Sequence, residues 1–338
     1  MESKFMPVCL TTLNRADKLK MCLESLAKCR YACDTEIFIS VDYPPNERYR
    51  GGYEKVIDYL HNEDFHSSFK KIEIIYQKEN LGAFKNSQYI VDKALEQFDC
   101  YLFVEDDIEF ADDALRYYNH FLESYRDDEN IMFIAGDNKL MIWGDKIVSS
   151  EATDKVTVAP WGAYALAGWK DKFLRLRRLC EEKYFEEEAT RPKNVCKLSK
   201  QSAFAFYYLM EDIVLRNPNG AYENGCLYAT DMLINIYLLL NDKYIILPGY
   251  SRVMNNGFDN SGLHCKDDIA MKTYIFNNHT LCAPIENGTR NLDYSLIKQM
   301  DNITKARKRI IRTWVKYFLF RILGLEKTMR VIGRFRQK

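Results

Sequence analysis

Three consecutive carboxylates, Glu105, Asp106 and Asp107, are the residues of this sequence with the clearest potential for chemistry. They lie within about 10 Å of extended chain, because a strand rises about 3.3 Å per residue. Like charges this close raise one another's pKa unless a cation neutralises them. A hard divalent ion suits such a group, since Mg²⁺ binds few protein carboxylates and keeps other positions for phosphate oxygens. A solvated acidic turn is the alternative interpretation.

Two further polar side chains follow predicted strands in the same way. An apolar run at 6–13 is followed closely by Arg15, and the strand predicted over 36–41 ends at Asp42. The acidic triplet itself follows the buried run 101–104. Strands that alternate with helical patterns predict a parallel, doubly wound α/β sheet, in which ligands bind beyond the carboxyl ends of the strands. We therefore expect these side chains to converge on one site.

The composition is that of a globular protein and excludes a fibrous or disordered chain. Hydrophobic residues make up 47% and charged residues 28% of the 338 residues. The ten cysteines contain no C-x-x-C pair and no His-Cys cluster, so we do not expect a zinc site. The sequence has no run of eighteen apolar residues and no signal-peptide pattern at its N-terminus, which predicts a cytoplasmic location.

Five segments, in their order along the chain, resemble the donor-binding core of GT-A glycosyltransferases. They are VCLTTLNRADKLKMCLESL, SVDYP, NLGAFKN, YLFVEDDIEFADDALRYY and GFDNSGLHC. The nearest resemblance is to the inverting N-acetylglucosaminyltransferase I type, which carries Glu-Asp-Asp in place of the commoner Asp-x-Asp. It implies a Rossmann-like, mostly parallel sheet and a metal-dependent transfer of sugar with Mn²⁺ or Mg²⁺. The implied donor is a nucleotide sugar, with a UDP-sugar as first candidate and UDP-GlcNAc as the sugar nucleotide that the nearest resemblance suggests.

The resemblance also implies roles for individual residues. Asp107 would bind the metal directly, while Glu105 and Asp106 would bind the ribose and sugar hydroxyls. Asp42 would accept a hydrogen bond from the imide of the base, and Arg15 would lie near the diphosphate or the base. For Arg15 the alternative is a solvated loop residue.

Further candidates come from the same resemblance. Lys85 would face phosphate, and Trp161 with Gly162 would form an aromatic loop over which a sugar ring stacks. His264 would complete contacts to the metal or the diphosphate, and residues 256–259 would cap the donor site. The alternatives are an exposed helical lysine for Lys85 and a structural role for His264, because a lone histidine is more often structural.

Inversion requires a carboxylate that deprotonates the acceptor hydroxyl. Asp231 opens an apolar helix predicted over 230–240 and resembles the base of the family. Its position has a second explanation, because the helix dipole favours an acid in the first turn in any case. Asp212 and Asp137 are the rival candidates for the base.

These assignments predict a glycosyltransferase domain over residues 1–300 and a tail over 301–338. Within the domain, residues 1–130 would bind the nucleotide sugar, and residues 131–300 would bind a glycan or lipid-linked saccharide acceptor. A sugar nucleotidyltransferase is an alternative, but LTTLNRADK lacks the Gly-rich phosphate loop expected after the first strand. A third interpretation is a noncatalytic carbohydrate-binding protein of the same fold.

The tail is strongly basic, since residues 305–338 contain twelve Lys or Arg and one acid. Large apolar residues recur in it at three- and four-residue steps, at Ile310, Trp314, Phe318, Ile322 and Leu325. This pattern predicts an amphipathic helix on an anionic membrane surface, here the inner face of the membrane. Nucleic acid could also bind the positive charge of the tail, but the high density of bulky apolar residues in it favours a membrane. A helix packed back onto the acidic body is the remaining alternative.

Overall fold

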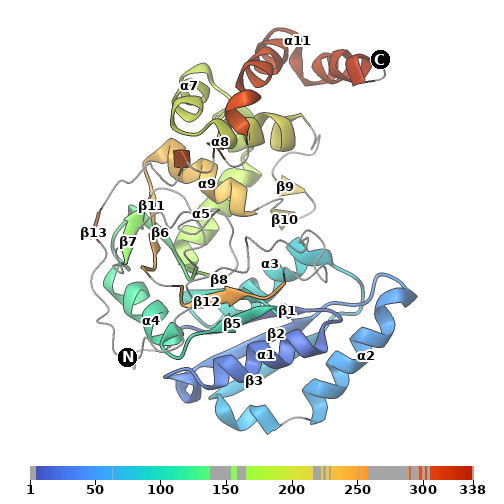
Figure 1. Cartoon of the computed structure of the whole chain (residues 1–338), viewed down its shortest axis with the longest axis vertical. Helices are drawn as coiled ribbons and strands as arrows, with labels where there is room; N and C mark the ends of the chain where they lie inside the picture. Colours follow the sequence, from blue (N-terminus) through green and yellow to red (C-terminus); the bar gives the residue numbers. More distant parts are fainter. Residues whose placement is uncertain are drawn as a thin grey trace. The chain divides into compact units, whose positions relative to one another are not determined.

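The computed structural model separates into two compact units, which can be followed by label in Figure 1. The sheet unit comprises residues 1–173 and 244–291, and the helical unit comprises residues 174–243 and 292–338. These units divide the chain at other points than residues 130 and 300, so the functional division made there stays a prediction. The structure describes residues 5–62, 64–137, 154–157, 165–215, 222–223, 226–227, 230–249, 251–257, 289–290, 297–298, 301–302 and 305–336.

Within the described residues, nine strands form one mixed sheet in the order β13-β7-β11-β6-β8-β4-β1-β2-β3. The strands are β1 Val8–Thr12, β2 Glu36–Val41, β3 Lys71–Tyr76, β4 Cys100–Glu105, β6 Ile131–Ala135, β7 Lys155–Thr157, β8 Ala165–Trp169, β11 Tyr244–Leu247 and β13 Thr289–Arg290. β1 pairs in parallel with both β2 and β4, and β2 pairs in parallel with β3. β8 is antiparallel to β4 and β6. The predicted α/β class with a mostly parallel sheet is confirmed.

The central strands are mostly apolar and are largely buried on both faces. In β2, the residues from Ile37 to Val41 are all buried, and β6 is buried throughout. Continuous apolar runs of this kind are typical of parallel strands covered by helices on both faces. The strand predicted over 36–41 coincides with β2.

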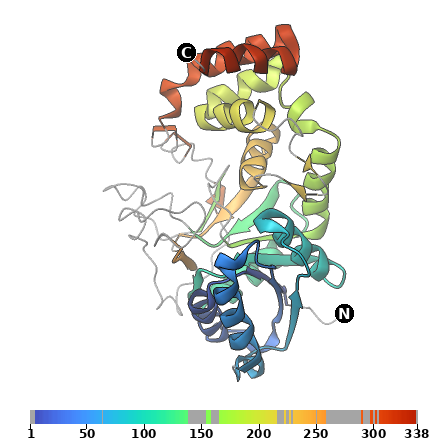
Figure 2. The same ribbon diagram turned by 90° about the vertical axis from the view of Figure 1, so that its right-hand side faces the viewer.

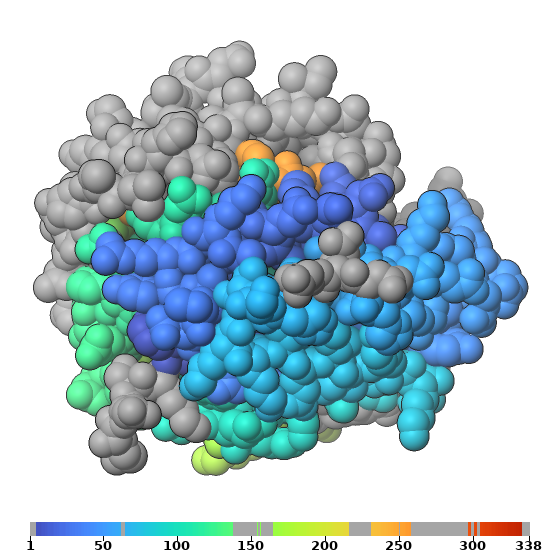
Figure 3. All heavy atoms as spheres, turned by 90° about the horizontal axis from the view of Figure 1, so that it is seen from below, coloured from blue at the N-terminus to red at the C-terminus, as the bar shows by residue number. Residues whose placement is uncertain are grey.

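Helices connect the successive parallel strands at the N-terminal end of the sheet unit. They are α1 Ala16–Ala27, α2 Glu47–Asn62, α3 Gly82–Leu95 and α4 Ala114–Ser124. α1 packs with its apolar stripe inward, as Leu19, Cys22, Leu23 and Leu26 are all buried. α1 also packs against α2, and α3 packs on β1, β2 and β4 (Figures 1 and 2). Figure 3 shows this N-terminal part of the chain, blue to cyan, on the lower face of the sheet unit.

A second, smaller pair of strands follows the acidic triplet. β5 (Ile108–Phe110) pairs in an antiparallel manner with β12 (Val253–Asn255). Asn255 lies opposite Ile108 in this pair, which brings the residues after β12 next to the end of β4. The pairing thus joins a late segment of the sequence to the acidic triplet.

The helical unit consists mainly of helices that surround α9. Its elements are α6 Tyr184–Glu187, α7 Pro192–Gln201, α8 Ala203–Tyr208, the π-helical turn η4 Leu209–Val214, α9 Thr230–Asn241, the 3-10 turn η7 Ala306–Lys308, α11 Ile310–Arg336 and the short pair β9 Tyr222–Glu223 with β10 Cys226–Leu227. The chain enters this unit through α5, Lys170–Glu181. α7 and α8 pack on α9, and α11 packs on α8 and η4. The predicted helix of the tail is present as α11, which a kink at Gly324 divides, because this glycine has a φ of 75° and a ψ of 172°.

Candidate active site

Asp106 and Asp107 lie in the tight turn between β4 and β5. Their exposed fractions are only 2% and 3%, so both carboxylates are removed from bulk water. Ionised carboxylates in such a position require cationic or hydrogen-bonding partners, because burial alone strongly disfavours the charged form. The turn therefore concentrates charge that a neighbouring element must neutralise.

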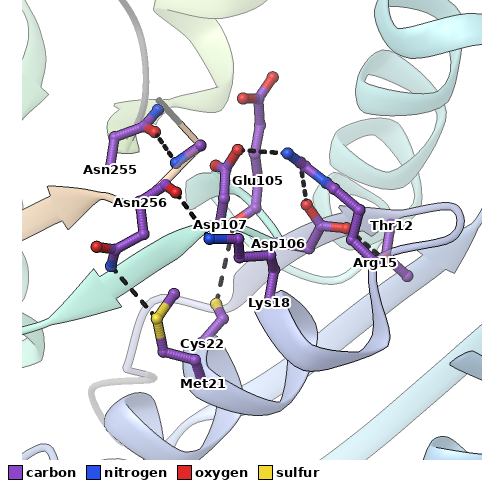
Figure 4. Close-up of polar contacts among 11 residues, drawn as sticks. Thr12, Arg15, Lys18, Met21, Cys22, Glu105, Asp106, Asp107, Asn255 and Asn256 are labelled. Carbon is purple, nitrogen blue, oxygen red and sulfur yellow. Dashed lines mark hydrogen bonds and ion pairs between the residues drawn. The ribbon is translucent and has the colours of Figure 1, made fainter. Parts of the chain in front are cut away.

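Arg15 supplies that neutralisation from the N-terminus of α1. Its Nη1 donates to Asp107 Oδ2 at 2.8 Å, and its Nη2 donates to Asp106 Oδ1 (Figure 4). Thr12, the last residue of β1, donates its hydroxyl to Asp106 Oδ2 at 2.7 Å. The carboxyl ends of the adjacent parallel strands β1 and β4 thus meet at one cluster, as the sequence predicts.

The electrostatics of this cluster depend on burial and on the ion pairs together. Burial raises the pKa of Asp106 to about 6, although Arg15 acts in the opposite direction. Burial also acts to lower the pKa of Arg15, but the two carboxylates outweigh it and hold that pKa above its ordinary value. Arg15 therefore stays protonated and is the main internal counter-ion of the site.

Replacing Arg15 with glutamine tests this role as counter-ion. The change removes the charge that lowers the pKa of Asp106, so this pKa rises further above the ordinary value of 3.8 that applies in the unfolded chain. We expect a loss of about 2–3 kcal/mol in the free energy of unfolding at pH 7. The folded variant binds more protons than the unfolded chain, so its stability rises as pH falls. The loss relative to the original protein therefore shrinks as pH falls toward about 6, the pKa of Asp106 in the original protein, and is smallest below that pH.

Urea unfolding of Arg15→Gln and of the original protein between pH 5 and pH 8 measures this loss. The matched control is Arg126→Gln, which removes an exposed arginine that pairs with Asp99 at the surface. A loss that is independent of pH, or equal for the two variants, would contradict the counter-ion role.

Asp107 has the features expected of a residue that can bind a metal ion. Its Oδ1 is buried and accepts no hydrogen bond from any of the described residues. Its Oδ2 lies so close to Gly257 that a Cβ there would come within 2.2 Å of it. A buried carboxylate oxygen without a hydrogen-bond donor is the kind of ligand that a small hard cation prefers. The carboxylate therefore fits Mg²⁺ or Mn²⁺.

No group of three or more His, Cys, Asp or Glu side chains able to hold a metal occurs within the part of the chain that the structure describes. His264, the other predicted ligand, lies outside the described residues. A single carboxylate is compatible with Mg²⁺, which commonly takes one or two protein carboxylates and fills its other positions with water and phosphate oxygens. The residues present thus fit a metal that is shared with a bound diphosphate.

Residues 255–257 form a strap beside Asp107. Asn256 donates its backbone N–H to the carbonyl oxygen of Asp107 at 2.8 Å, and Gly257 donates to Asn255 Oδ1 at 2.7 Å. Lys18 donates its ammonium to the carbonyl oxygen of Asn256 at 2.9 Å. These bonds fix the strap to the turn after β4 and to α1 (Figure 4). That residues 256–259 cap the donor site stays a prediction, and residues 258 and 259 lie outside the described residues.

Asp42 follows β2, and its carboxylate holds the loop that precedes α3. Oδ1 accepts hydrogen bonds from the backbone N–H groups of Tyr43 and Leu81. Oδ2 accepts hydrogen bonds from the backbone N–H of Gly82 and from the side-chain amide of Asn80, and all four distances are 2.8–3.2 Å. Gly82 has a φ of 76°, which glycine adopts without strain. Burial raises the pKa of Asp42, and the backbone hydrogen bonds partly offset this effect. Asp42 therefore anchors the loop, and its contact with a base stays a prediction.

Asp42→Ala tests the anchoring role. The backbone N–H groups of Leu81 and Gly82 would lose their acceptor, and an unsatisfied polar group of this kind costs about 1–3 kcal/mol. We expect faster amide hydrogen exchange at these two residues, by about tenfold or more, since 1.4 kcal/mol corresponds to a factor of ten. Asp42→Asn, which keeps one carbonyl acceptor, should show a smaller change. Unaltered exchange in the alanine variant would rule out the anchoring role.

The remaining predicted donor-site residues differ in how the structure places them. Glu105 is the partly exposed last residue of β4, and Figure 4 shows its carboxylate directed away from the Arg15 guanidinium. Lys85 is exposed in the first turn of α3. Trp161 and Gly162 lie outside the described residues. The roles of all four stay predictions.

Asp231, the predicted base, belongs to the helical unit. It lies in the first turn of α9 and is partly exposed, and its carbonyl oxygen accepts a hydrogen bond from Asn235 at 2.9 Å. Its rival Asp212 lies in η4 of the same unit, and Asp137 is buried directly after β6 in the sheet unit. The assignment of the base therefore stays a prediction.

Sequence reasoning missed Thr12, Lys18 and Asn255. Thr12 could have been found, because it ends the same strand that Arg15 follows. Lys18 also had a signal, since residues three apart on a helix share one face and Arg15 begins that face. Asn255 had none, because the pairing with Ile108 that places it beside the acidic triplet joins two segments far apart in the sequence.

No protein-family model matches the sequence, and no curated protein matches it. Among solved structures, 51% of the chain is similar to 46% of the mannosyltransferase PcManGT from Pyrobaculum calidifontis in complex with GDP-Man and Mn²⁺, with 12% sequence identity and a TM-score of 0.34. A further similarity links 39% of the chain to 21% of S. aureus TarS, with 16% identity and a TM-score of 0.29. The chain thus matches less than half the length of either protein. With scores this low, its function must be argued from its own residues.

Proposed function

We propose that this chain is a metal-dependent, inverting glycosyltransferase that moves a sugar from a nucleotide-sugar donor to a glycan or lipid-linked saccharide. The observation that carries the proposal is the cluster of Arg15, Asp106 and Asp107 at the carboxyl ends of β1 and β4. The loop held by Asp42 lies at the same end of the neighbouring strand β2. In open α/β sheets this edge is where nucleotides bind.

The charges at this edge suit a diphosphate. Arg15 and Lys18 both come from the first turns of α1, where the helix dipole adds partial positive charge. Lys85 occupies the corresponding part of α3, and it is the proposed third phosphate contact. We propose a UDP-sugar as donor, with UDP-N-acetylglucosamine as first candidate, on the strength of the resemblance in sequence.

Asp107 is the proposed metal ligand, with His264 as the second. A bound Mn²⁺ or Mg²⁺ would stabilise negative charge on the leaving diphosphate. Asp106, held by Thr12 and Arg15, would accept hydrogen bonds from donor hydroxyls together with Glu105. The unpartnered Oδ1 of Asp107 supports its part in this assignment.

Asp231 is the proposed general base. It would take the proton of the acceptor hydroxyl while that oxygen attacks the anomeric carbon and the bond to the donor phosphate breaks. A nucleoside diphosphate would then leave, and the configuration at the anomeric carbon would invert. Trp161 and Gly162 are the proposed contacts of a sugar ring.

The proposed place of action is the inner, cytoplasmic face of a membrane, where residues 305–338 would contact anionic lipid. A lipid-linked acceptor would explain why a sugar transferase needs such a surface. Of the helices that the structure describes, none is both long enough and apolar enough to span a bilayer.

A donor panel tests the proposed reaction. The protein is incubated with UDP- and GDP-sugars, with and without Mn²⁺, in the presence of membrane lipid extract and of free saccharides. Metal-dependent release of the nucleoside diphosphate with labelled sugar in the acceptor is the expected result. Absence of transfer from every donor would contradict the proposal, and pyrophosphate release from UTP with a sugar phosphate would indicate a nucleotidyltransferase.

A further inference from the structure

α11 carries apolar residues on two different faces, and only one of them packs on the helical unit. On the packed face, Thr313, Lys316 and Tyr317 are buried. The Trp314 ring contacts Phe206, with ring centroids 4.9 Å apart. The sequence places Trp314 on the predicted membrane face together with Phe318 and Ile322, but its ring is partly buried against α8 instead. The apolar residues of this helix thus serve two purposes.

The second face consists of four large apolar side chains that are more than half exposed. Their exposed fractions are 77% for Ile311, 54% for Val315, 55% for Phe318 and 78% for Ile322. The steps of four, three and four residues place them within about 60° of arc, because each residue turns a helix by about 100°. No other large hydrophobic side chain among the described residues exceeds 41% exposure. We call these four residues the α11 apolar face.

Arginines flank the α11 apolar face on both sides. Arg312 and Arg321 are exposed and are turned by about a quarter of a revolution from its centre, one in each direction. Residues 310–323 contain no acid. Exposed Lys308 and Arg309 lie just before the helix. The face is therefore an apolar stripe with one exposed arginine on each side.

Buried contacts fix the direction in which this face points. Lys316 donates to both carboxylate oxygens of Glu211, and the two side chains are 7% and 5% exposed. The Tyr317 hydroxyl donates to the carbonyl oxygen of Thr190 at 3.1 Å. A buried ion pair is costly to break, because separation would leave a buried charge uncompensated. Rotation of α11 to hide its apolar face would break these contacts.

We propose that the α11 apolar face inserts into the headgroup boundary of an anionic phospholipid membrane. The four apolar side chains would enter the acyl region while Arg312 and Arg321 would meet lipid phosphates, which is the arrangement of helices that lie in an interface. A second copy of the chain is a poorer occupant, because pairing two such faces would bring like-charged arginines together. This inference specifies the membrane partner proposed above and does not depend on sugar transfer.

Sedimentation of the full-length chain with vesicles tests this proposal. The experiment compares vesicles of phosphatidylcholine alone with vesicles in which about one lipid in three is the anionic phosphatidylglycerol. We expect binding to the anionic vesicles that weakens at least about tenfold when all four residues of the α11 apolar face are changed to serine. Arg312→Gln and Arg321→Gln should each weaken it about fivefold, since a basic residue near the surface contributes about 1 kcal/mol.

Leu174→Ser is the matched control, because it makes the same kind of change at an exposed position of α5 in the same unit. Thermal unfolding monitored by circular dichroism shows whether each variant folds. The proposal is overturned if the original protein binds no vesicles, or if the fourfold serine variant binds them as well as Leu174→Ser does. A dimer that becomes monomeric in the serine variant, without vesicle binding, would assign the face to a second copy.

Discussion

Changing Asp107 to asparagine is expected to lower kcat/KM for sugar transfer about a thousandfold, while the fold is retained. The amide oxygen is a weaker ligand for a hard cation, and metal stabilisation of a leaving phosphate contributes several kcal/mol, of which each 1.36 kcal/mol is tenfold in rate. Asn and Asp have nearly the same shape, so the carbonyl contact with Asn256 and the close approach of Gly257 should persist.

The matched control for this change is Asp99→Asn. The Asp99 side chain is 75% exposed and pairs with Arg126 at the surface, so the change should leave the rate nearly unaltered. Rates for the three proteins are measured from nucleoside diphosphate release over a range of Mn²⁺ concentrations. An Asp107→Asn protein that turns over normally and still depends on Mn²⁺ would remove Asp107 from the metal site.

Changing Asp231 to asparagine is expected to reduce kcat by about a thousandfold, in the range that general base catalysis contributes. Binding of the nucleotide should be unaffected, because the base acts on the acceptor hydroxyl and not on the donor. The measurement combines single-turnover rates with calorimetric binding of UDP. A loss of kcat with unaltered donor affinity is the specific signature of this role.

Asp212→Asn is the comparison for this second change, since Asp212 is an acid in another helical element of the same unit. We expect it to keep most of the activity. If Asp212→Asn is inactive and Asp231→Asn is active, Asp212 takes the role of base. If both variants retain activity, no base lies in the helical unit.

Much of the sheet unit could be predicted because its signals are local. The strands from β1 to β4 are apolar runs that end in polar residues, and parallel pairing then brings those ends to one edge. The meeting of Arg15 with Asp106 and Asp107 follows from this topology. The resemblance in sequence added the expectation that these residues bind a nucleotide sugar.

Other features depend on contacts that no local pattern encodes. Asp42 was expected to meet a base, but its four hydrogen-bond donors come from its own neighbour and from a loop nearly forty positions later. The periodicity of α11 predicted an amphipathic helix correctly. It could not tell which apolar face packs inward, because Trp314 and Phe318 both fit the same spacing and only the contact with Phe206 distinguishes them.

The contact between Arg15 and Asp107 has a consequence for donor binding. Arg15 neutralises Asp107, the carboxylate that a metal would use. A metal ion that binds without a nucleotide must therefore compete with the guanidinium of Arg15. A metal that arrives with a diphosphate brings a new anionic partner for Arg15. Metal and nucleotide should therefore bind with positive coupling.

Calorimetric titration of UDP into the protein, with and without Mn²⁺, tests the nucleotide-sugar site most directly. The account predicts that Mn²⁺ tightens UDP binding at least about tenfold, and that Asp107→Asn abolishes this gain while Asp99→Asn preserves it. UDP binding that is absent under all conditions, or that is equally strong with and without the metal in every variant, would contradict the account.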